Sequence, residues 1–354
     1  MDKLNVGVIG IGKMGLLHSG IFNGLEESKL AAVSEKDKIM SMTLKKYLPR
    51  VNVYKDYEKM FKSEDLDVLV ITTPVFLHKP MIEDAIDHDL NIFVEKPLAI
   101  NSEECKSILN KGIKSKTLVG YCRRFMGTYA YVKKLIDKKV LGNVISFQSQ
   151  LFVEQVLNKE KGWQYDPTKS GGGVLMDLGS HAIDLIHYFF GEIDSAIGIG
   201  KTIYSKNVED YVSANFKLKN NIIGSLQLSW SMRNYRLPEL KFNIQLEDGM
   251  IIVTEKYVEI YSDVENEMLK RGWNTFYKQT LTGEVPLDIG GPEYTLEDLH
   301  LLNCIKEDKS TLCDFKEAAM TNCVIDSMYS SIGAGDSIYS SVETSDLHKI
   351  KYGV

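Results

Sequence analysis

The chain has 354 residues, 44% of them hydrophobic and 25% charged, a composition that is ordinary for a globular protein. This length predicts two domains, since one domain usually holds roughly 100–200 residues. The net charge of -6 argues against a nucleic-acid partner, because no basic excess exists to release counterions. We expect no membrane span and no secretion signal, because the long apolar runs that these need are missing. The five cysteines follow no metal spacing, so we expect free thiols, no bound metal and a cytoplasmic location.

A glycine-rich motif follows the first expected strand, residues 4–9, and opens an expected helix that runs to about residue 25. The motif consists of Gly10, Ile11, Gly12, Lys13, Met14 and Gly15. In a strand–GxGxxG–helix arrangement, the first glycine permits a tight turn, the second lets the backbone approach a pyrophosphate, and the third lets the helix pack on the sheet. The helix N-terminus then offers N–H groups to phosphates. The motif predicts a dinucleotide site.

The second expected strand, residues 30–34, ends at Glu35, which lies 20 residues after Gly15. A carboxylate at this point accepts hydrogen bonds from the ribose hydroxyls and repels a 2′-phosphate, so NAD is favoured. Lys36 and Lys38 weaken this preference, because they suit an adenosine phosphate. NADP therefore stays open as an alternative.

Strands and helices continue to alternate through the first third of the chain. Further strands are expected at residues 67–71, 91–94 and 117–120, and helices at 77–88 and after Asn101. This alternation predicts a doubly wound parallel sheet, and we assign residues 1–121 to this first domain. The strand 67–71 ends at Thr72, Thr73 and Pro74. His78, in the helix that follows, is interpreted as facing the cofactor or, alternatively, as a surface histidine.

The stretch 91–98, NIFVEKPL, ends a buried strand with Glu95, Lys96 and Pro97. Ligands of open α/β sheets bind outside the carboxyl ends of the strands, so Lys96 is expected at the ligand crevice. The proline keeps Lys96 out of helical geometry and ends the strand abruptly. A surface lysine in a loop is the alternative.

The character of the chain changes after Tyr121. A helix at residues 122–138 starts with Arg123 and Arg124, which either bind substrate or cofactor oxygens or form structural ion pairs. Residues 155–173 form a polar stretch with Trp163, Tyr165 and three consecutive glycines, which is typical of a binding loop.

Residues 173–191, GVLMDLGSHAIDLIHYFFG, predict a helix with Asp177 and His181 on one face. The carboxylate can orient the imidazole and stabilise its protonated form, which makes His181 a competent general base. Two alternatives are a polar face of a packed helix and a metal site with Asp184 and His187. The metal site is disfavoured because His181 and His187 lie on different faces.

Residues 192–263 alternate apolar and polar side chains, with turns at Asn220-Asn221 and Asp248-Gly249. This predicts a large, mainly antiparallel sheet in an α+β domain that spans residues 122–354. Its exposed face is expected to join subunits into a homodimer or homotetramer. Residues 264–293 are expected to be irregular, with helices at 295–305 and 315–332.

The chain resembles the glucose–fructose oxidoreductase / inositol dehydrogenase / MocA (Gfo/Idh/MocA-type) family of nicotinamide-dependent oxidoreductases. The resemblance is carried by VGVIGIGKMG at 6–15, TTPVFLH at 72–78, VEKPLA at 94–99, GYCRRF at 120–125 and GGGVLMDLGSHAIDL at 171–185. It implies an NAD(P)-binding Rossmann domain and an active site lined by Lys96, Asp177 and His181. It also implies hydride transfer between nicotinamide and a hydroxyl-bearing carbon of a sugar, sugar derivative or cyclitol.

The expected roles follow from this resemblance. His181 takes the hydroxyl proton, Asp177 steadies it, and Lys96 stabilises the alkoxide. The residues expected at the cofactor are 10–15, Glu35, Thr72, Thr73, Pro74, His78, Glu95 and Lys96. The residues expected at the substrate are Tyr121, Arg124, Trp163, Tyr165, Asp177 and His181. Two other functions stay open: an NAD-dependent glycoside hydrolase that acts by transient oxidation, and a non-catalytic regulatory protein that binds nucleotide.

Overall fold

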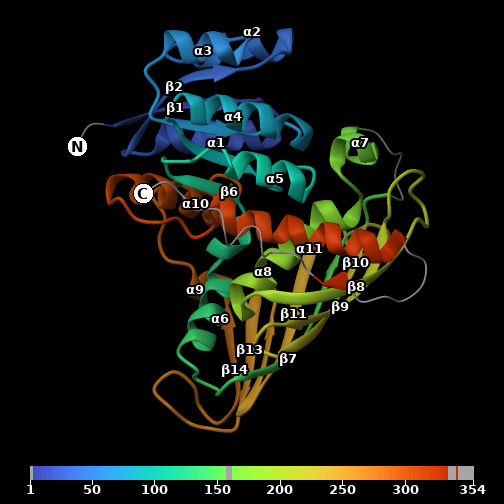
Figure 1. Cartoon of the computed structure of the whole chain (residues 1–354). Helices are drawn as coiled ribbons and strands as arrows, with labels where there is room; N and C mark the ends of the chain where they lie inside the picture. Colours follow the sequence, from blue (N-terminus) through green and yellow to red (C-terminus); the bar gives the residue numbers. More distant parts are fainter. Residues whose placement is uncertain (1–2, 157–161, 334–339, 342–354) are drawn as a thin grey trace. The chain divides into compact units, whose positions relative to one another are not determined.

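The computed structural model describes residues 3–156, 162–333 and 340–341, which fall into two compact units (Figure 1). The first unit contains residues 3–122 and 284–319, and the second contains the remaining described residues. The chain thus returns to the first unit near its end, which differs from the continuous second domain predicted at 122–354. Parts of the predicted loop 155–173 and of the predicted second domain, at 157–161 and 342–354, lie outside the described residues.

The first unit is built on a sheet of six parallel strands in the order β3-β2-β1-β4-β5-β6. The strands are β1 (Leu4–Ile9), β2 (Ser28–Ser34), β3 (Asn52–Tyr54), β4 (Val68–Ile71), β5 (Asn91–Glu95) and β6 (Thr117–Gly120). The strand order reverses between β1 and β4, the point where such sheets bind ligands. The predicted Rossmann-type sheet is confirmed. Strand β3 was not predicted, because three residues are too few to show an apolar period.

Helices separate the strands of this sheet. They are α1 (Lys13–Gly24), α2 (Lys38–Tyr47), α3 (Tyr57–Ser63), α4 (His78–Asp87) and α5 (Ser102–Leu109), with the 3₁₀ turn η1 (Val75–Leu77) before α4. Asn101 caps α5 by accepting a hydrogen bond from the Glu104 N–H at 2.8 Å. The returning segment contributes α10 (Pro292–Lys306), which packs on α1 and β6 and is drawn in orange-red in Figure 1.

The second unit is built on a nine-stranded sheet in the order β14-β13-β12-β11-β7-β10-β9-β8-β15. Its strands are β7 (Val144–Phe152), β8 (Ile193–Lys201), β9 (Tyr211–Leu218), β10 (Ile223–Ser229), β11 (Glu239–Leu246), β12 (Gly249–Val253), β13 (Tyr257–Ser262), β14 (Gly272–Tyr277) and β15 (Ser340–Ser341). The pairing is antiparallel except between β7 and β10, so the prediction of a mainly antiparallel sheet is confirmed. The prediction that 264–293 is irregular is wrong, since β14 and α9 (Lys278–Leu281) lie there.

One face of this sheet is buried under the helices α6 (Gly127–Asp137), α8 (Ser180–Phe190) and the second-unit part of α11 (Phe315–Gly333). Phe147, Phe242 and Trp230 lie in the core between sheet and helices. The opposite face carries polar side chains at alternate positions, as the period of two predicts. Among the described residues, no helix combines the length and apolar character needed to cross a membrane.

Candidate active site

The glycine-rich loop after β1 has two kinds of glycine. A Cβ at Gly15 would lie 2.0 Å from the Gly10 carbonyl oxygen, and Gly10 itself has a positive φ of 85°, so packing and conformation require both glycines. Gly12 differs, because a Cβ there would meet no described atom within 4 Å. Gly12 stands at the N-terminus of α1. The open space in front of it fits the close approach of a pyrophosphate to the backbone.

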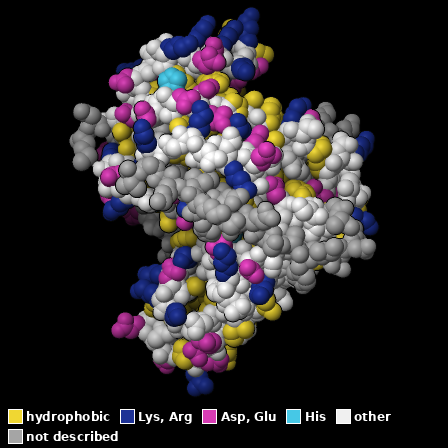
Figure 2. All heavy atoms as spheres, in the orientation of Figure 1, with side chains coloured by type: hydrophobic (Ala, Val, Ile, Leu, Met, Phe, Trp, Pro, Cys, Tyr) yellow, Lys and Arg dark blue, Asp and Glu magenta, His cyan; other side chains and the backbone are white. Residues whose placement is uncertain are grey.

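Glu35 is fixed beside this loop. Its Oε2 accepts a hydrogen bond from the Ile11 N–H and its Oε1 accepts one from the Asp37 N–H, each at 2.7 Å. Each carboxylate oxygen keeps a second lone pair, so the group can still accept from ribose hydroxyls. Lys36 and Lys38 are exposed, and Figure 2 shows lysine and arginine side chains gathered over α2 and α3. The residues at this point therefore fit NAD, and the basic surroundings leave NADP chemically acceptable.

His78 joins the turn after β4 to the end of β5. Its Nε2 lies 2.9 Å from the carbonyl oxygen of Thr73, and its Nδ1 lies 3.0 Å from that of Pro97. Burial lowers the pKa of His78, and the two backbone hydrogen bonds oppose this shift. The interpretation of His78 as a surface histidine is wrong, because the side chain is buried. Thr72, in the same turn, donates to the Gly10 carbonyl at 2.6 Å.

The end of β5 carries Lys96 next to a buried chain of charged groups. Glu95 accepts the Lys96 N–H through Oε2, and its Oε1 lies 3.2 Å from His18 Nε2. His18 Nδ1 lies 2.9 Å and 3.0 Å from the two carboxylate oxygens of Asp298 on α10. Burial disfavours the charged imidazole, but the charge of Asp298 and the hydrogen bonds to Asp298 and Glu95 outweigh burial and hold the pKa of His18 well above 6.5. No local sequence pattern marks His18 or Asp298 as part of a site.

Asp177 and His181 belong to the second unit. Asp177 lies in a π-helical turn, η4 (Leu175–Gly179), which leads directly into α8, where His181 stands. The predicted helix therefore exists but begins with one wider turn. Such turns inside helices occur often at functional sites. Asp177 is half-buried, and the side chain of His181 is 8% exposed.

A buried carboxylate holds the start of this turn. Glu209 accepts hydrogen bonds from the N–H groups of Gly173 and Leu175, at 3.0 Å each, and from the Tyr329 hydroxyl at 2.8 Å. A Cβ at Gly173 would lie 2.0 Å from the Glu209 carbonyl oxygen, and one at Gly172 would lie 1.8 Å from the Tyr329 oxygen. Two of the three glycines in the stretch predicted as a binding loop, Gly172 and Gly173, are thus required by close packing. Glu209 and Tyr329 were not predicted as part of the site, because each lies far along the chain from the turn that it holds.

Arg124 forms a buried ion pair. Its Nε and Nη2 donate to Asp184 at 3.0 Å and 2.8 Å, and its guanidinium lies 5.0 Å from the centre of the Tyr188 ring. With Arg124 4% exposed and Asp184 1% exposed, the geometry favours the structural alternative over the predicted contact with substrate. The same ion pair engages the Asp184 carboxylate that the metal alternative requires. Within the described part of the chain, no cluster of three or more His, Cys, Asp or Glu side chains is placed to hold a metal ion.

The aromatic residues predicted at the substrate differ in exposure. Tyr121 is fully buried in the first unit, and Tyr165 packs against Trp230 in the second with ring centres 5.8 Å apart. Trp163 is 38% exposed. Of these three, Trp163 therefore has the most side-chain surface available to a ligand.

Comparison with known proteins agrees with this architecture. The family model described as "Oxidoreductase family, NAD-binding Rossmann fold" matches residues 4–121, and the model described as "GFO/IDH/MocA C-terminal domain" matches residues 129–252. The two matches together cover more than half of the chain. The chain belongs to the Gfo/Idh/MocA family of oxidoreductases.

Among curated proteins, the chain is similar to Oxidoreductase P35 of Formosa agariphila, with 31% identity over 55% of this chain and 63% of that protein. It is also similar to scyllo-inositol 2-dehydrogenase (NAD(+)) of Bacillus subtilis, with 27% identity over 59% of this chain and 60% of that protein. The matches thus span about three fifths of these relatives' own lengths. A solved levoglucosan dehydrogenase, in complex with NADH and levoglucosan, shares the fold with a TM-score of 0.88 and 21% identity over 97% of this chain and 100% of that one.

Proposed function

We propose that this protein is an NAD-dependent dehydrogenase that oxidises a CH–OH group of a sugar, sugar derivative or cyclitol, or reduces the corresponding carbonyl. The observation that carries the proposal is the pair of motifs at the carboxyl ends of β1 and β5. The first is a glycine loop with open space over Gly12, and the second is a lysine directly after a buried strand. The similarity to a scyllo-inositol dehydrogenase and a levoglucosan dehydrogenase supports the polyhydroxylated substrate class.

NAD, when bound, supplies the hydride acceptor or donor, and the side chains manage the proton and the charge. His181 takes the hydroxyl proton of the substrate during oxidation. Asp177, one turn before it, orients the imidazole and stabilises its protonated form. Lys96 stabilises the negative charge that develops on the substrate oxygen. General acid–base catalysis of this kind contributes roughly 10²–10⁴-fold to the rate.

Glu35 supports NAD as the preferred cofactor. Its carboxylate is held by two backbone N–H groups, from Ile11 and Asp37, so it cannot turn away to admit a 2′-phosphate without breaking both hydrogen bonds. A charged phosphate beside a fixed carboxylate is repelled. We therefore expect tighter binding of NADH than of NADPH.

The experiment that tests this function is an absorbance assay for NADH. Purified protein is incubated with NAD⁺ and separate pools of cyclitols, free sugars, sugar acids and nucleotide sugars, with NADP⁺ in parallel. With NAD⁺, we expect NADH to appear in one pool. With NADP⁺ and the same pool, we expect NADPH to appear more slowly. Release of a sugar from a model glycoside without net NADH would instead identify a glycoside hydrolase, and failure to bind either cofactor would contradict the proposal.

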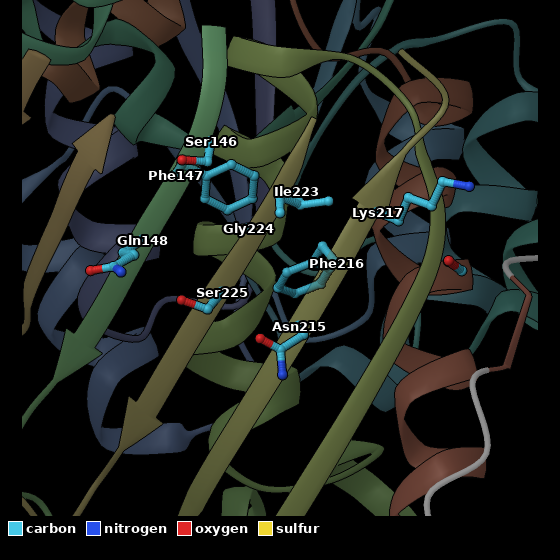
Figure 3. Close-up of a pocket in the computed structure, with 10 residues that line it drawn as sticks. Ser146, Phe147, Gln148, Asn215, Phe216, Lys217, Ile223, Gly224 and Ser225 are labelled. Carbon is cyan, nitrogen blue, oxygen red and sulfur yellow. The ribbon is translucent and has the colours of Figure 1, made fainter. Parts of the chain in front are cut away.

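The outer face of the second-unit sheet supports assembly into a homodimer or homotetramer. A hollow of about 650 Å³ crosses β7, β10 and β9, and Gln148, Ser225 and Asn215 lie side by side across it (Figure 3). Ile223 in the same hollow and Trp273 on β14 are each 60% exposed. Apart from Lys217, the side chains that line the hollow are uncharged, which suits a face that a second copy covers. Light scattering of the wild type and of Ser225→Arg tests this, and a monomeric wild type would contradict it.

A further inference from the structure

We propose that His18 and His78 are positioning residues that hold the two sides of Lys96. The inference rests on the proposed function, in that Lys96 is taken as the residue that stabilises charge on the substrate. It adds His18 and His78 to the residues on which the position of Lys96 depends. In each histidine, one ring nitrogen faces the neighbour of Lys96 and the other faces a more distant anchor.

The residue before Lys96 is held by His18. Glu95 accepts the Lys96 N–H with one carboxylate oxygen and faces His18 Nε2 with the other, at 3.2 Å in both cases. His18 is itself held from behind, because its Nδ1 lies 2.9 Å from Asp298 Oδ1. Carboxylates only accept hydrogen bonds, so an imidazolium that donates from both nitrogens satisfies both partners. The result is a buried chain Asp298–His18–Glu95 that ends at the backbone of Lys96.

The residue after Lys96 is held by His78. Its Nδ1 lies 3.0 Å from the Pro97 carbonyl oxygen, and its Nε2 lies 2.9 Å from the Thr73 carbonyl oxygen. Both partners are carbonyl oxygens, which only accept hydrogen bonds, so the neutral ring that burial favours donates to one of them. With the proton on Nδ1, His78 holds the segment that carries Lys96 through the Pro97 carbonyl. Both histidines are buried, with side chains 0% and 1% exposed, so solvent offers no alternative partners.

The two histidines use opposite nitrogens toward Lys96. His18 contacts Glu95, the residue before Lys96, through Nε2, whereas His78 contacts Pro97, the residue after it, through Nδ1. The side-chain amide of glutamine places its nitrogen near the position of Nε2, and that of asparagine near the position of Nδ1. Replacement of each histidine by Gln and by Asn therefore removes one contact while it keeps a donor for the other.

The experiment compares His18→Gln, His18→Asn, His78→Gln and His78→Asn in the full chain, with Ser28→Ala as the control. Ser28 is buried and donates to the Phe22 carbonyl at 2.7 Å, away from Lys96. Two quantities are measured at a temperature where thermal melting shows every variant folded. The first is the turnover number. The second is the pH profile of Lys96 acetylation by trace acetic anhydride, read by mass spectrometry, which requires no substrate.

We expect a crossed pattern. His18→Asn and His78→Gln should displace the Lys96 acetylation profile and lower turnover by about 10–100-fold, the usual effect of a small misplacement of a catalytic group. His18→Gln, His78→Asn and Ser28→Ala should stay closer to the wild type in both measurements. A purely structural role predicts that Gln and Asn behave alike at each position, and that result would overturn the proposal. A crossed acetylation pattern in a protein without dehydrogenase activity would sustain the positioning role and refute the proposed function.

Discussion

The segments around Lys96 and Asp177 are both fixed by buried groups, but by different means. Lys96 is held through charged and imidazole side chains that come from α1, α4 and α10. The turn of Asp177 is held through its own backbone, with two N–H groups on one carboxylate and glycines where no side chain fits. We therefore expect the Lys96 segment to be disturbed by substitutions that change charge or hydrogen bonding. We expect the Asp177 turn to be disturbed by substitutions that add side-chain volume. The following variants test this difference.

The largest effect is expected for Lys96→Ala. Loss of the ammonium group removes the stabilisation of charge on the substrate oxygen, so turnover should fall by about 10²–10⁴-fold. NADH affinity, measured by fluorescence titration, should change little. The exposed Lys114→Ala serves as the control for loss of a positive charge. Retained turnover in Lys96→Ala would remove Lys96 from the mechanism.

A matched pair of glycine variants separates cofactor binding from folding. In Gly12→Ala the new Cβ meets no described atom, so we expect an unchanged melting temperature and weakened NADH binding. In Gly15→Ala the Cβ lies 2.0 Å from a carbonyl oxygen, so we expect destabilisation by about 1–3 kcal/mol in urea unfolding. Full NADH affinity in Gly12→Ala would mean that the cofactor does not lie against this loop.

Glu209→Gln tests the hydrogen bonds by which the Glu209 carboxylate holds the start of the π-helical turn. The substitution replaces one acceptor oxygen with an amide nitrogen that cannot accept, so the Gly173 N–H, which lies 3.1 Å and 3.0 Å from the two oxygens, faces a donor on one side. The remaining oxygen must then accept from Gly173, Leu175 and Tyr329 alone. We expect a loss of about 1–3 kcal/mol in unfolding free energy, with turnover reduced and NADH affinity preserved. Glu247→Gln is the control, because Glu247 accepts a backbone N–H in a similar way at the surface. Equal effects of the two substitutions would contradict a specific role for Glu209.

The last expected effect concerns pH and leaves turnover at neutral pH unchanged. Burial, and then the charge of Arg124, lower the pKa of His187 from 6.5 to about 4. In the unfolded chain, His187 therefore becomes protonated as pH falls through 6.5. In the folded chain, it stays neutral until about pH 4. The stability contributed by His187 is complete above pH 6.5 and is lost as pH falls toward 4, amounting to about 2 kcal/mol at pH 5. Urea unfolding at pH 7 and pH 5 should show this loss in the wild type, and a smaller loss in His187→Leu. The exposed His88→Leu should behave like the wild type.

The sequence was most informative where a local pattern decides the structure. The strand before Gly10, the glycine spacing and the position of Glu35 lie within one stretch, and the structure has the predicted strand, turn and helix there. The period of two in β9 and β10 likewise led to the correct hairpin, with Asn221 at a φ of 68° in its turn. Lys96 was located at the end of a buried strand for the same reason.

The sequence was least informative where distant residues meet. His18 and Asp298 are separated by 280 positions, and no local pattern indicates that they pair. Arg124, whose contact with substrate stays a prediction, shows the same limit. Two arginines near a strand end suggest an anion site, but the partner that neutralises Arg124 is Asp184, 60 residues further on. The π-helical turn was missed because its cause lies in the distant Glu209 and Tyr329 rather than in the residues of the turn.

The return of residues 284–319 to the first unit has a consequence for how the protein is made. During synthesis the chain emerges from its N-terminus, and domains generally begin to fold in that order. Here the segment that supplies Asp298 and α10 is translated only after strands β7 to β14 of the second unit. Until then, the surface of α1 that α10 covers is exposed, and His18 lacks the Asp298 carboxylate and has only Glu95 as a counter-charge. The first unit therefore cannot complete its fold until most of the protein has left the ribosome. This makes it a candidate client for chaperones during translation.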